Sequence, residues 1–179
     1  MERYGLDVQW NPARDAPGVP QRCARFQAVA PPDARASEFL SSLVVAAAAG
    51  ERVACVAEGA FVAPTEVARN VATPGIAPAG AGFVVAARGA SALASLLEEW
   101  QAESIWMAFG GEERIEALEA AVRGPRWWEL DRSRAPLEAV SRLGCVIRVA
   151  LDHASLEAFG DVPAVLRFLD CATRAAKVS

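Results

Sequence analysis

Apolar residues follow two alternating patterns along this chain: short continuous runs, and longer stretches in which they recur every three or four positions. Continuous runs of about four to eight residues are typical of strands, and the longer periodic stretches are typical of amphipathic helices. The runs predict strands at 23–30, 52–57, 82–88, 104–109 and 145–151, with a shorter one at 126–130. The periodic stretches predict helices at 34–49, 65–71, 91–102, 112–123, 136–143 and 155–175.

The central runs carry few polar residues, and this decides the expected fold class. A run such as Arg52–Ala57 (RVACVA) is typical of a strand that is buried on both faces. Strands of this kind that alternate with helices are typical of parallel sheets. The sequence therefore predicts an α/β fold, a mostly parallel open sheet with helices on both faces. Its expected core lies on adjacent parallel strands: Val53, Cys55, Val84, Val85, Ile105, Met107, Val146 and Ile147.

Proline and glycine divide the chain into an arm, a domain and a long internal connection. Residues 1–20 contain Pro12, Pro17 and Pro20 and are expected to form an N-terminal arm. Residues 21–179 are expected to form a single α/β domain, because this length suits one core. The segment 59–80 is long for a connection inside a compact domain, and such connections are usually functional.

The distribution of charge argues against nucleic acid as a partner. The chain has 18 basic and 22 acidic residues, for a net charge of −4. Between Glu98 and Asp131 there are nine carboxylates and only three arginines. Such a stretch repels a phosphate backbone, whereas proteins bind nucleic acid through lysine and arginine. We therefore expect no direct nucleic-acid partner.

The cysteines and the apolar runs predict a cytoplasmic protein. Cys23, Cys55, Cys145 and Cys171 form no CxxC pair, and an isolated cysteine in an apolar strand behaves as a small buried hydrophobe. The N-terminal residues do not follow the pattern of a signal peptide, which favours a reducing compartment. The longest apolar run, Leu43–Ala49, is too short to span a bilayer, so we expect no membrane partner.

The turns between predicted strands and helices hold no recognisable catalytic or ligand-binding motif. Ala30–Ser37 lacks the glycines and the lysine of a phosphate-binding loop. Gly110–Gly111 is followed by two glutamates, which would repel a phosphate. Only Arg88–Ser91 has side chains that suit an anion. Because His153 is the only histidine, a His-rich metal site is not expected. We expect no catalytic residue, no cofactor and no metal.

The order of segments between residues 23 and 151 follows a family pattern. The helix at 34–49 leads through Gly50, Glu51 and Val53 into a buried strand, and Glu58-Gly59-Ala60-Phe61 comes directly after it. The segments GFVVAARGASALASLLEEW and SIWMAF then form a strand–helix–strand unit. Together these segments resemble the core of the RecA/KaiC-type ATPases. The resemblance places Glu58 at the family's catalytic glutamate.

The departures from this family pattern concern the nucleotide site. Ala30, Arg35 and Ala36 fall at the two glycines and the lysine of the family's GxxxxGK[ST] loop, and only Ser37 is retained. Phe109-Gly110 stand where an aspartate would hold Mg²⁺. Phosphoryl transfer depends on these positioning and charge-stabilising groups. The resemblance therefore implies a RecA-like fold with a degenerate phosphate loop. In this respect the chain is similar to SulA-type division inhibitors, ImuA-type mutagenesis proteins and MEDS sensory domains.

This resemblance implies a catalytically inactive bacterial regulatory protein that acts by protein–protein contact. The expected setting is the DNA-damage (SOS) response or cell-division control. The expected partner is a RecA-family, polymerase or division protein, and a homodimer is an alternative. Two other functions stay open: a small acidic immunity or antitoxin-type inhibitor, and an enzyme with an unrecognised site. Such an enzyme would use Asp152, His153 and the segment 59–80.

The predicted partner-binding surface combines carboxylates with tryptophans. Glu112, Glu116 and Glu119 fall on one face of the predicted helix at 112–123, where their field would attract a basic partner. Trp127 and Trp128 follow, and tryptophan is enriched at binding hot spots. The segment 59–80 is the second candidate for this surface.

Overall fold

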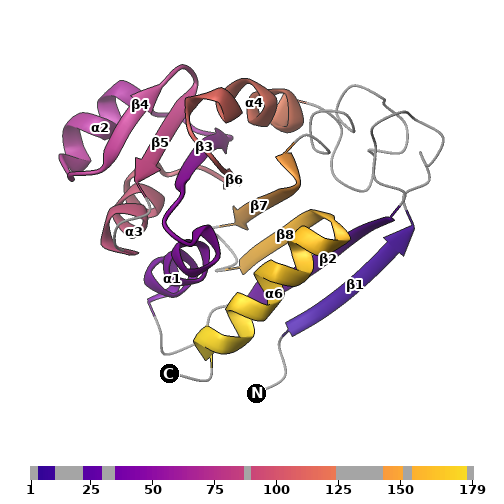
Figure 1. The fold of residues 1–179 in the computed structure, drawn as a ribbon. Helices are drawn as coiled ribbons and strands as arrows, with labels where there is room; N and C mark the ends of the chain where they lie inside the picture. Colours follow the sequence, from indigo (N-terminus) through magenta and orange to yellow (C-terminus); the bar gives the residue numbers. More distant parts are fainter. Residues whose placement is uncertain are drawn as a thin grey trace.

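The computed structural model describes residues 4–10, 22–29, 35–86, 90–123, 143–150 and 155–176, which form one eight-stranded sheet with helices on both faces (Figure 1). The strands are β1 (Tyr4–Trp10), β2 (Arg22–Val29), β3 (Arg52–Glu58), β4 (Ile76–Ala79), β5 (Gly82–Ala86), β6 (Ser104–Phe109), β7 (Cys145–Ala150) and β8 (Ser155–Asp161). The helices are α1 (Ala36–Ala48), α2 (Pro64–Val71), α3 (Ala90–Glu99), the short 3₁₀ helix η1 (Glu112–Arg114), α4 (Ile115–Arg123) and α6 (Val162–Ala176). Across the sheet the strand order is β1-β2-β8-β7-β6-β3-β5-β4.

Every pair of neighbouring strands in this sheet is antiparallel, so the predicted mostly parallel, RecA-like sheet is wrong. β3 shows the arrangement at the centre of the sheet, where Cys55 lies opposite Phe83 of β5 and Met107 of β6. The strand directions therefore alternate from one edge of the sheet to the other.

Three crossover helices explain why the sequence suggested a parallel sheet. The units β2–α1–β3, β3–α2–β4 and β5–α3–β6 each join two strands that point the same way, as crossover helices do in parallel sheets. Here the joined strands are not neighbours. β5 separates β3 from β4, β3 separates β5 from β6, and three strands separate β2 from β3. A strand–helix–strand pattern predicts the relative direction of two strands but not which strand lies between them.

The helices cover the two faces of the sheet unequally. α1, α3 and α6 pack on one face, and the buried Leu40, Leu43 and Val44 of α1 follow helical spacing toward the strands. α4 packs on the other face through Ile115 and Leu118. None of the helices described here combines the length and apolar character that crossing a bilayer requires.

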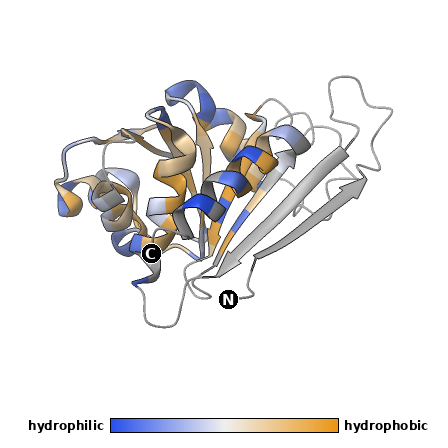
Figure 2. Cartoon of the chain, turned by 60° about the horizontal axis from the view of Figure 1, so that its bottom comes forward, coloured by the Kyte–Doolittle hydropathy of each residue, from blue (hydrophilic) through white to orange (hydrophobic). Residues whose placement is uncertain are grey.

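The predicted core residues are all buried. Because side chains alternate along a strand, Val53 and Cys55 pack under α1 and α3, whereas Ala54 and Val56 pack under α4. The central strands are therefore apolar on both sides, which Figure 2 shows as a hydrophobic layer between the helices. Burial on both faces was expected correctly, but it occurs here in antiparallel strands.

Three strands were not expected from the sequence. β1 comes from residues assigned to the N-terminal arm, and β4 lies in the segment 59–80. β8 replaces the first part of the helix predicted at 155–175, and α6 begins only at Val162. In β8, Leu156 and Ala158 are buried in the core while Glu157 lies on the opposite face. This alternation is the strand signal. The segment predicted at 126–130 lies outside the described residues, as does all of the helix predicted at 136–143 except its last residue.

An acidic substitution at the sheet centre tests this packing. We expect Val85→Asp to prevent folding, because Val85 is buried and an unpaired buried carboxylate costs several kcal/mol, about the whole stability of a domain. Ala77→Asp on edge strand β4 is the control, since Ala77 is exposed. Circular dichroism melting would measure both variants. A cooperative melt of Val85→Asp near the wild-type temperature would show that β5 is misplaced.

Candidate binding site at the end of strand β3

Five polar or amphipathic side chains lie on the face of the sheet that α4 partly covers. They come from four adjacent strands and are called the polar row: Glu58 of β3, Ser104 and Trp106 of β6, Arg148 of β7 and Glu157 of β8. The register brings them together, because Ser104 is opposite Glu58, and Arg148 is opposite both Trp106 and Glu157. Antiparallel pairs place such opposite side chains on the same face.

One carboxylate oxygen of Glu58 accepts two hydrogen bonds at one end of this row. Ser104 Oγ donates to Glu58 Oε2 at 2.8 Å, and Trp106 Nε1 donates to the same oxygen at 3.1 Å. Arg148 Nε lies 3.7 Å from Oε2 and donates to Ser104 Oγ at 3.2 Å. Oε1 of Glu58 accepts no hydrogen bond from any residue that the structure describes. The carboxylate is thus fixed through one oxygen.

Arg148 links the two carboxylates of the polar row. Its Nη1 atom lies 3.5 Å from Glu157 Oε2, and its guanidinium carbon lies 5.9 Å from the centre of the Trp106 ring. The side chains of Arg148, Glu58 and Glu157 are 27%, 33% and 11% exposed, so these charges are partly withdrawn from water. Partly buried charges need their partners, because solvation no longer compensates them fully. Among the described residues, Glu58 and Glu157 share this one guanidinium group.

Glu58 also lines a hollow of about 520 Å³ next to the polar row. The hollow lies between the end of β3, the loop that follows it and the last turn of α4. Its walls are mainly apolar and include Val56, Val62 and Val122, while Glu119 and Arg123 form an ion pair at its α4 side. An apolar hollow with a few charged groups has the character of a binding pocket, and its volume falls in the usual range of about 300–1,000 Å³.

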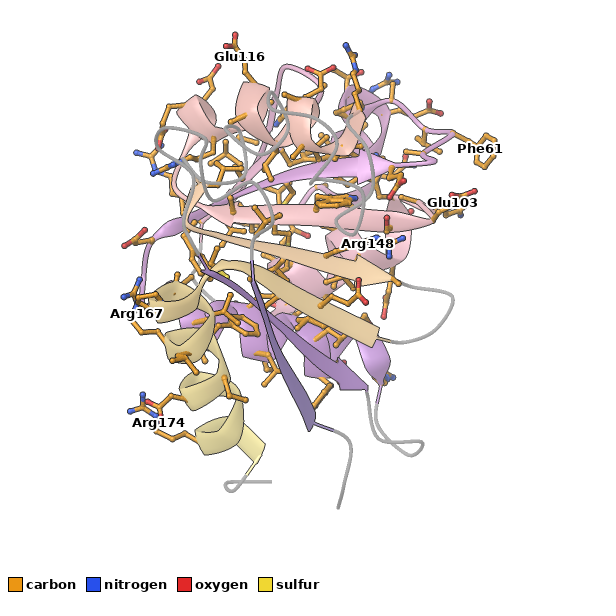
Figure 3. The ribbon with its side chains drawn as sticks, turned by 90° about the vertical axis from the view of Figure 1, so that its right-hand side faces the viewer. Phe61, Glu103, Glu116, Arg148, Arg167 and Arg174 are labelled. Atoms are coloured by element: carbon orange, nitrogen blue, oxygen red, sulfur yellow. The ribbon has the colours of Figure 1, made fainter. Side chains whose placement is uncertain are left out.

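Phe61 projects from the loop 59–63 beside this hollow (Figure 3). Its exposed fraction is 93%, although the loop is held on both sides of it. Before it, Gly59 adopts φ +67° and packs against the side chain of Glu103. After it, the Val62 carbonyl accepts a hydrogen bond from Trp100 Nε1 at 3.3 Å. Trp100 is itself buried edge-on against Phe83, so the loop is attached to the core.

The residues predicted to bind a partner are not brought together by the described part of the structure. Glu119 lines the hollow, whereas Glu116 is exposed on α4 and points away from the molecule in Figure 3. Glu112 belongs to η1 rather than to α4. Trp127 and Trp128 lie outside the described residues, so the aromatic half of the predicted surface stays a prediction.

Other candidates from the sequence contribute little chemistry. Burial raises the pKa of the Cys55 thiol far above its usual range, so this cysteine is a core residue rather than a nucleophile. Within the described ranges no three His, Cys, Asp or Glu side chains are grouped as metal ligands. The turns at 30–34 and 87–89, together with Asp152 and His153, lie outside those ranges.

The sequence contained a signal for the polar row that was not used. Arg148 interrupts the apolar run Cys145–Ala150, and Glu58 and Ser104 stand at the ends of two other apolar runs. A charged residue inside a buried strand needs a partner, and the alternation of side chains limits where that partner lies. The strand order that joins these positions could not be obtained from the sequence.

Removing Arg148 tests the polar row. We expect Arg148→Met to lower the free energy of unfolding by about 1–3 kcal/mol, because it removes the guanidinium group that contacts two partly buried carboxylates. Adding Glu157→Gln should restore part of this loss, since it removes one of the two carboxylates that Arg148 contacts. Chemical denaturation would measure the three proteins, with Arg167→Met on the exposed side of α6 as control. A loss no larger than that of the control would show that the contacts of Arg148 are not stabilising.

Glu113 gives a pH-dependent prediction at the start of η1. The Gly111 amide donates to Glu113 Oε1 at 2.9 Å, and this backbone hydrogen bond lowers the pKa of the Glu113 carboxyl. A lowered folded-state pKa stabilises the protein above the unfolded pKa, about 4.3 for glutamate, and the stabilisation is lost as pH falls through the folded value. Glu113→Gln should therefore lower the melting temperature at pH 7 and lose this effect near pH 3. The exposed Glu51→Gln is the control, and a pH-independent difference would contradict the prediction.

Comparison of the chain with protein-family models, with curated proteins and with solved structures finds no match. The regulatory role and the cellular setting expected from the sequence therefore stay predictions. The function is argued below from the geometry of this chain alone.

Proposed function

We propose that this chain is a binding module that recognises another protein through Phe61 and the hollow beside it. The observation that carries the proposal is the exposure of Phe61 in a loop that is otherwise held in place. This proposal keeps the contact-based, non-catalytic role expected from the sequence. It moves the binding surface to the segment 59–80, which was the second candidate.

The exposure of Phe61 contrasts with the burial of other aromatic side chains nearby. Phe83, Trp100 and Trp106 are buried, and among the described residues only Phe61 and Leu166 are large apolar side chains classed as exposed. Leaving a phenylalanine in water forgoes about 1.5–3 kcal/mol of burial free energy. Phenylalanine is enriched in protein interfaces, where a partner supplies the missing contacts. Phe61 therefore has the character of an anchor residue.

The charges around Phe61 indicate the kind of partner. Glu103 lies against Gly59, and Glu58 and Glu119 line the hollow. Among the described residues that line it, Arg123 is the one basic side chain. Arg123 is paired with Glu119, so the surroundings of Phe61 are negative. Such a surface attracts basic partners and repels acidic ones, which affects association rate and specificity more than affinity. The expected partner carries an apolar recess next to basic side chains.

The test uses position 61 to trap and then measure the partner. A photo-reactive phenylalanine analogue at position 61 should cross-link a protein in the native host, and mass spectrometry would identify it. With that protein purified, Phe61→Ala should weaken binding about thirtyfold, as expected for an anchor worth about 2 kcal/mol. Surface plasmon resonance would measure the affinity.

Leu166→Ala provides a matched control, because Leu166 is an exposed apolar residue on α6, away from the hollow. It should bind the partner within twofold of wild type. If the purified partner binds Phe61→Ala as tightly as wild type, Phe61 is not the anchor. Cross-linking only to a second copy of this chain would instead assign the surface to a homodimer and contradict the proposal.

A further inference from the structure

We infer that the hollow beside Phe61 receives a basic side chain of the partner, with its cationic head on Glu58 and its methylene stem on the apolar wall. This inference rests on the proposed function, because it specifies the partner segment that lies next to Phe61. It does not follow from the exposure of Phe61, since an aromatic anchor alone could face a wholly apolar partner.

The Glu58 carboxylate is oriented to accept a further hydrogen bond. Its Oε2 atom is held by Ser104 and Trp106, which fixes the rotation of the group. Its Oε1 atom has no hydrogen bond within the described residues, and Glu58 lines the hollow. An ionised oxygen with unused acceptor capacity binds an ammonium or guanidinium N–H more strongly than a neutral donor.

The walls of the hollow suit the stem of a lysine or arginine. Val56, Val62 and Val122 provide apolar contacts between Glu58 and the outer edge formed by the loop 59–63. Long basic side chains bury their methylene groups on such surfaces while the head reaches a polar partner. A volume of about 520 Å³ leaves room for the stem without displacing the loop.

The charge balance selects a cation over an anion. Arg148 is shared by Glu58 and Glu157, and Arg123 is paired with Glu119. Among the described residues at the hollow and its loop, the carboxylates of Glu58, Glu103 and Glu119 outnumber the one guanidinium group that lines it, that of Arg123. An incoming carboxylate or phosphate would meet a negative field, whereas an incoming cation would reduce the local negative charge.

The experiment uses a defined probe and does not require the partner. Acetyl-Ala-Arg-Ala-amide would be titrated into the ¹⁵N-labelled protein, with the acetyl-Ala-citrulline-Ala-amide peptide as its neutral counterpart of nearly equal shape. The reporter signals are the Trp106 indole N–H, which donates to Glu58, and the Gly59 amide. The arginine peptide should bind weakly and shift both signals, and the citrulline peptide should bind about fivefold more weakly, as expected for loss of a partly exposed ion pair.

Three variants separate recognition of the charge from effects on folding. Glu58→Gln should weaken the arginine peptide about fivefold and leave the citrulline peptide unchanged. Glu66→Gln is the control, because Glu66 is an exposed glutamate on α2 that does not line the hollow. Arg123→Gln should instead tighten the arginine peptide, since it removes the cation beside Glu119. An opposite effect of this kind would not arise from simple destabilisation.

The outcomes distinguish this inference from the proposed function. Equal binding of the two peptides, or no binding of either, overturns the inference without touching the cross-linking result at Phe61. Binding of free agmatine at least as tightly as the arginine peptide also overturns it, because the hollow would then be a small-molecule site. Selective binding of the arginine peptide together with loss of partner binding in Phe61→Ala supports both.

Discussion

The constraint on which the rest of the structure depends is the burial of β3 on both faces. Two helix layers cover its alternating side chains, with Val53 and Cys55 on one side and Ala54 and Val56 on the other. The two layers do not have the same extent. α4 has nine residues and is about 13 Å long, whereas the seven residues of β3 extend over about 23 Å. Among the described elements α4 is the one α-helix on this face of β3 and is shorter than the strand, and the hollow lies where β3 passes the end of α4, at Glu58.

Local elements could be predicted from the sequence because their signals are local. The apolar spacing of Leu40, Leu43 and Val44 fixes the buried face of α1, and the run from Ser104 to Phe109 matches β6 residue for residue. The strand order could not be predicted in this way. β5 and β6 are joined by a crossover helix and point the same way, but no residue in that unit shows that β3 lies between them. The resemblance to a parallel ATPase core followed from this missing information.

β8 shows a second limit of the sequence analysis. Its residues SLEAFGD alternate between the two faces, and only Gly160 and Pro163 mark the junction with the helical pattern of α6. Gly160 is required within the strand, because a Cβ there would lie 1.9 Å from the Gly144 carbonyl oxygen. A glycine inside a predicted helix is weak support for a strand unless the neighbouring backbone is known. The backbone next to β7 lies so close to β8 that only a glycine fits at position 160.

The candidate site was only partly predictable for the same reason. Glu119 and the segment 59–80 were identified from charge and from length, but the residues that complete the site belong to strands distant in sequence. β6 and the residue before it bring these parts together: Ser104 holds the Glu58 carboxylate, and the preceding Glu103 packs against Gly59. The carboxylate and the loop that carries Phe61 are therefore positioned by consecutive residues. Groups held in this way lose little conformational freedom when a partner binds, so more of the contact energy contributes to affinity. The loop that carries Phe61 is already held on both sides of that residue, so it loses little conformational entropy when a partner binds. An exposed aromatic residue on such a loop is suited to binding.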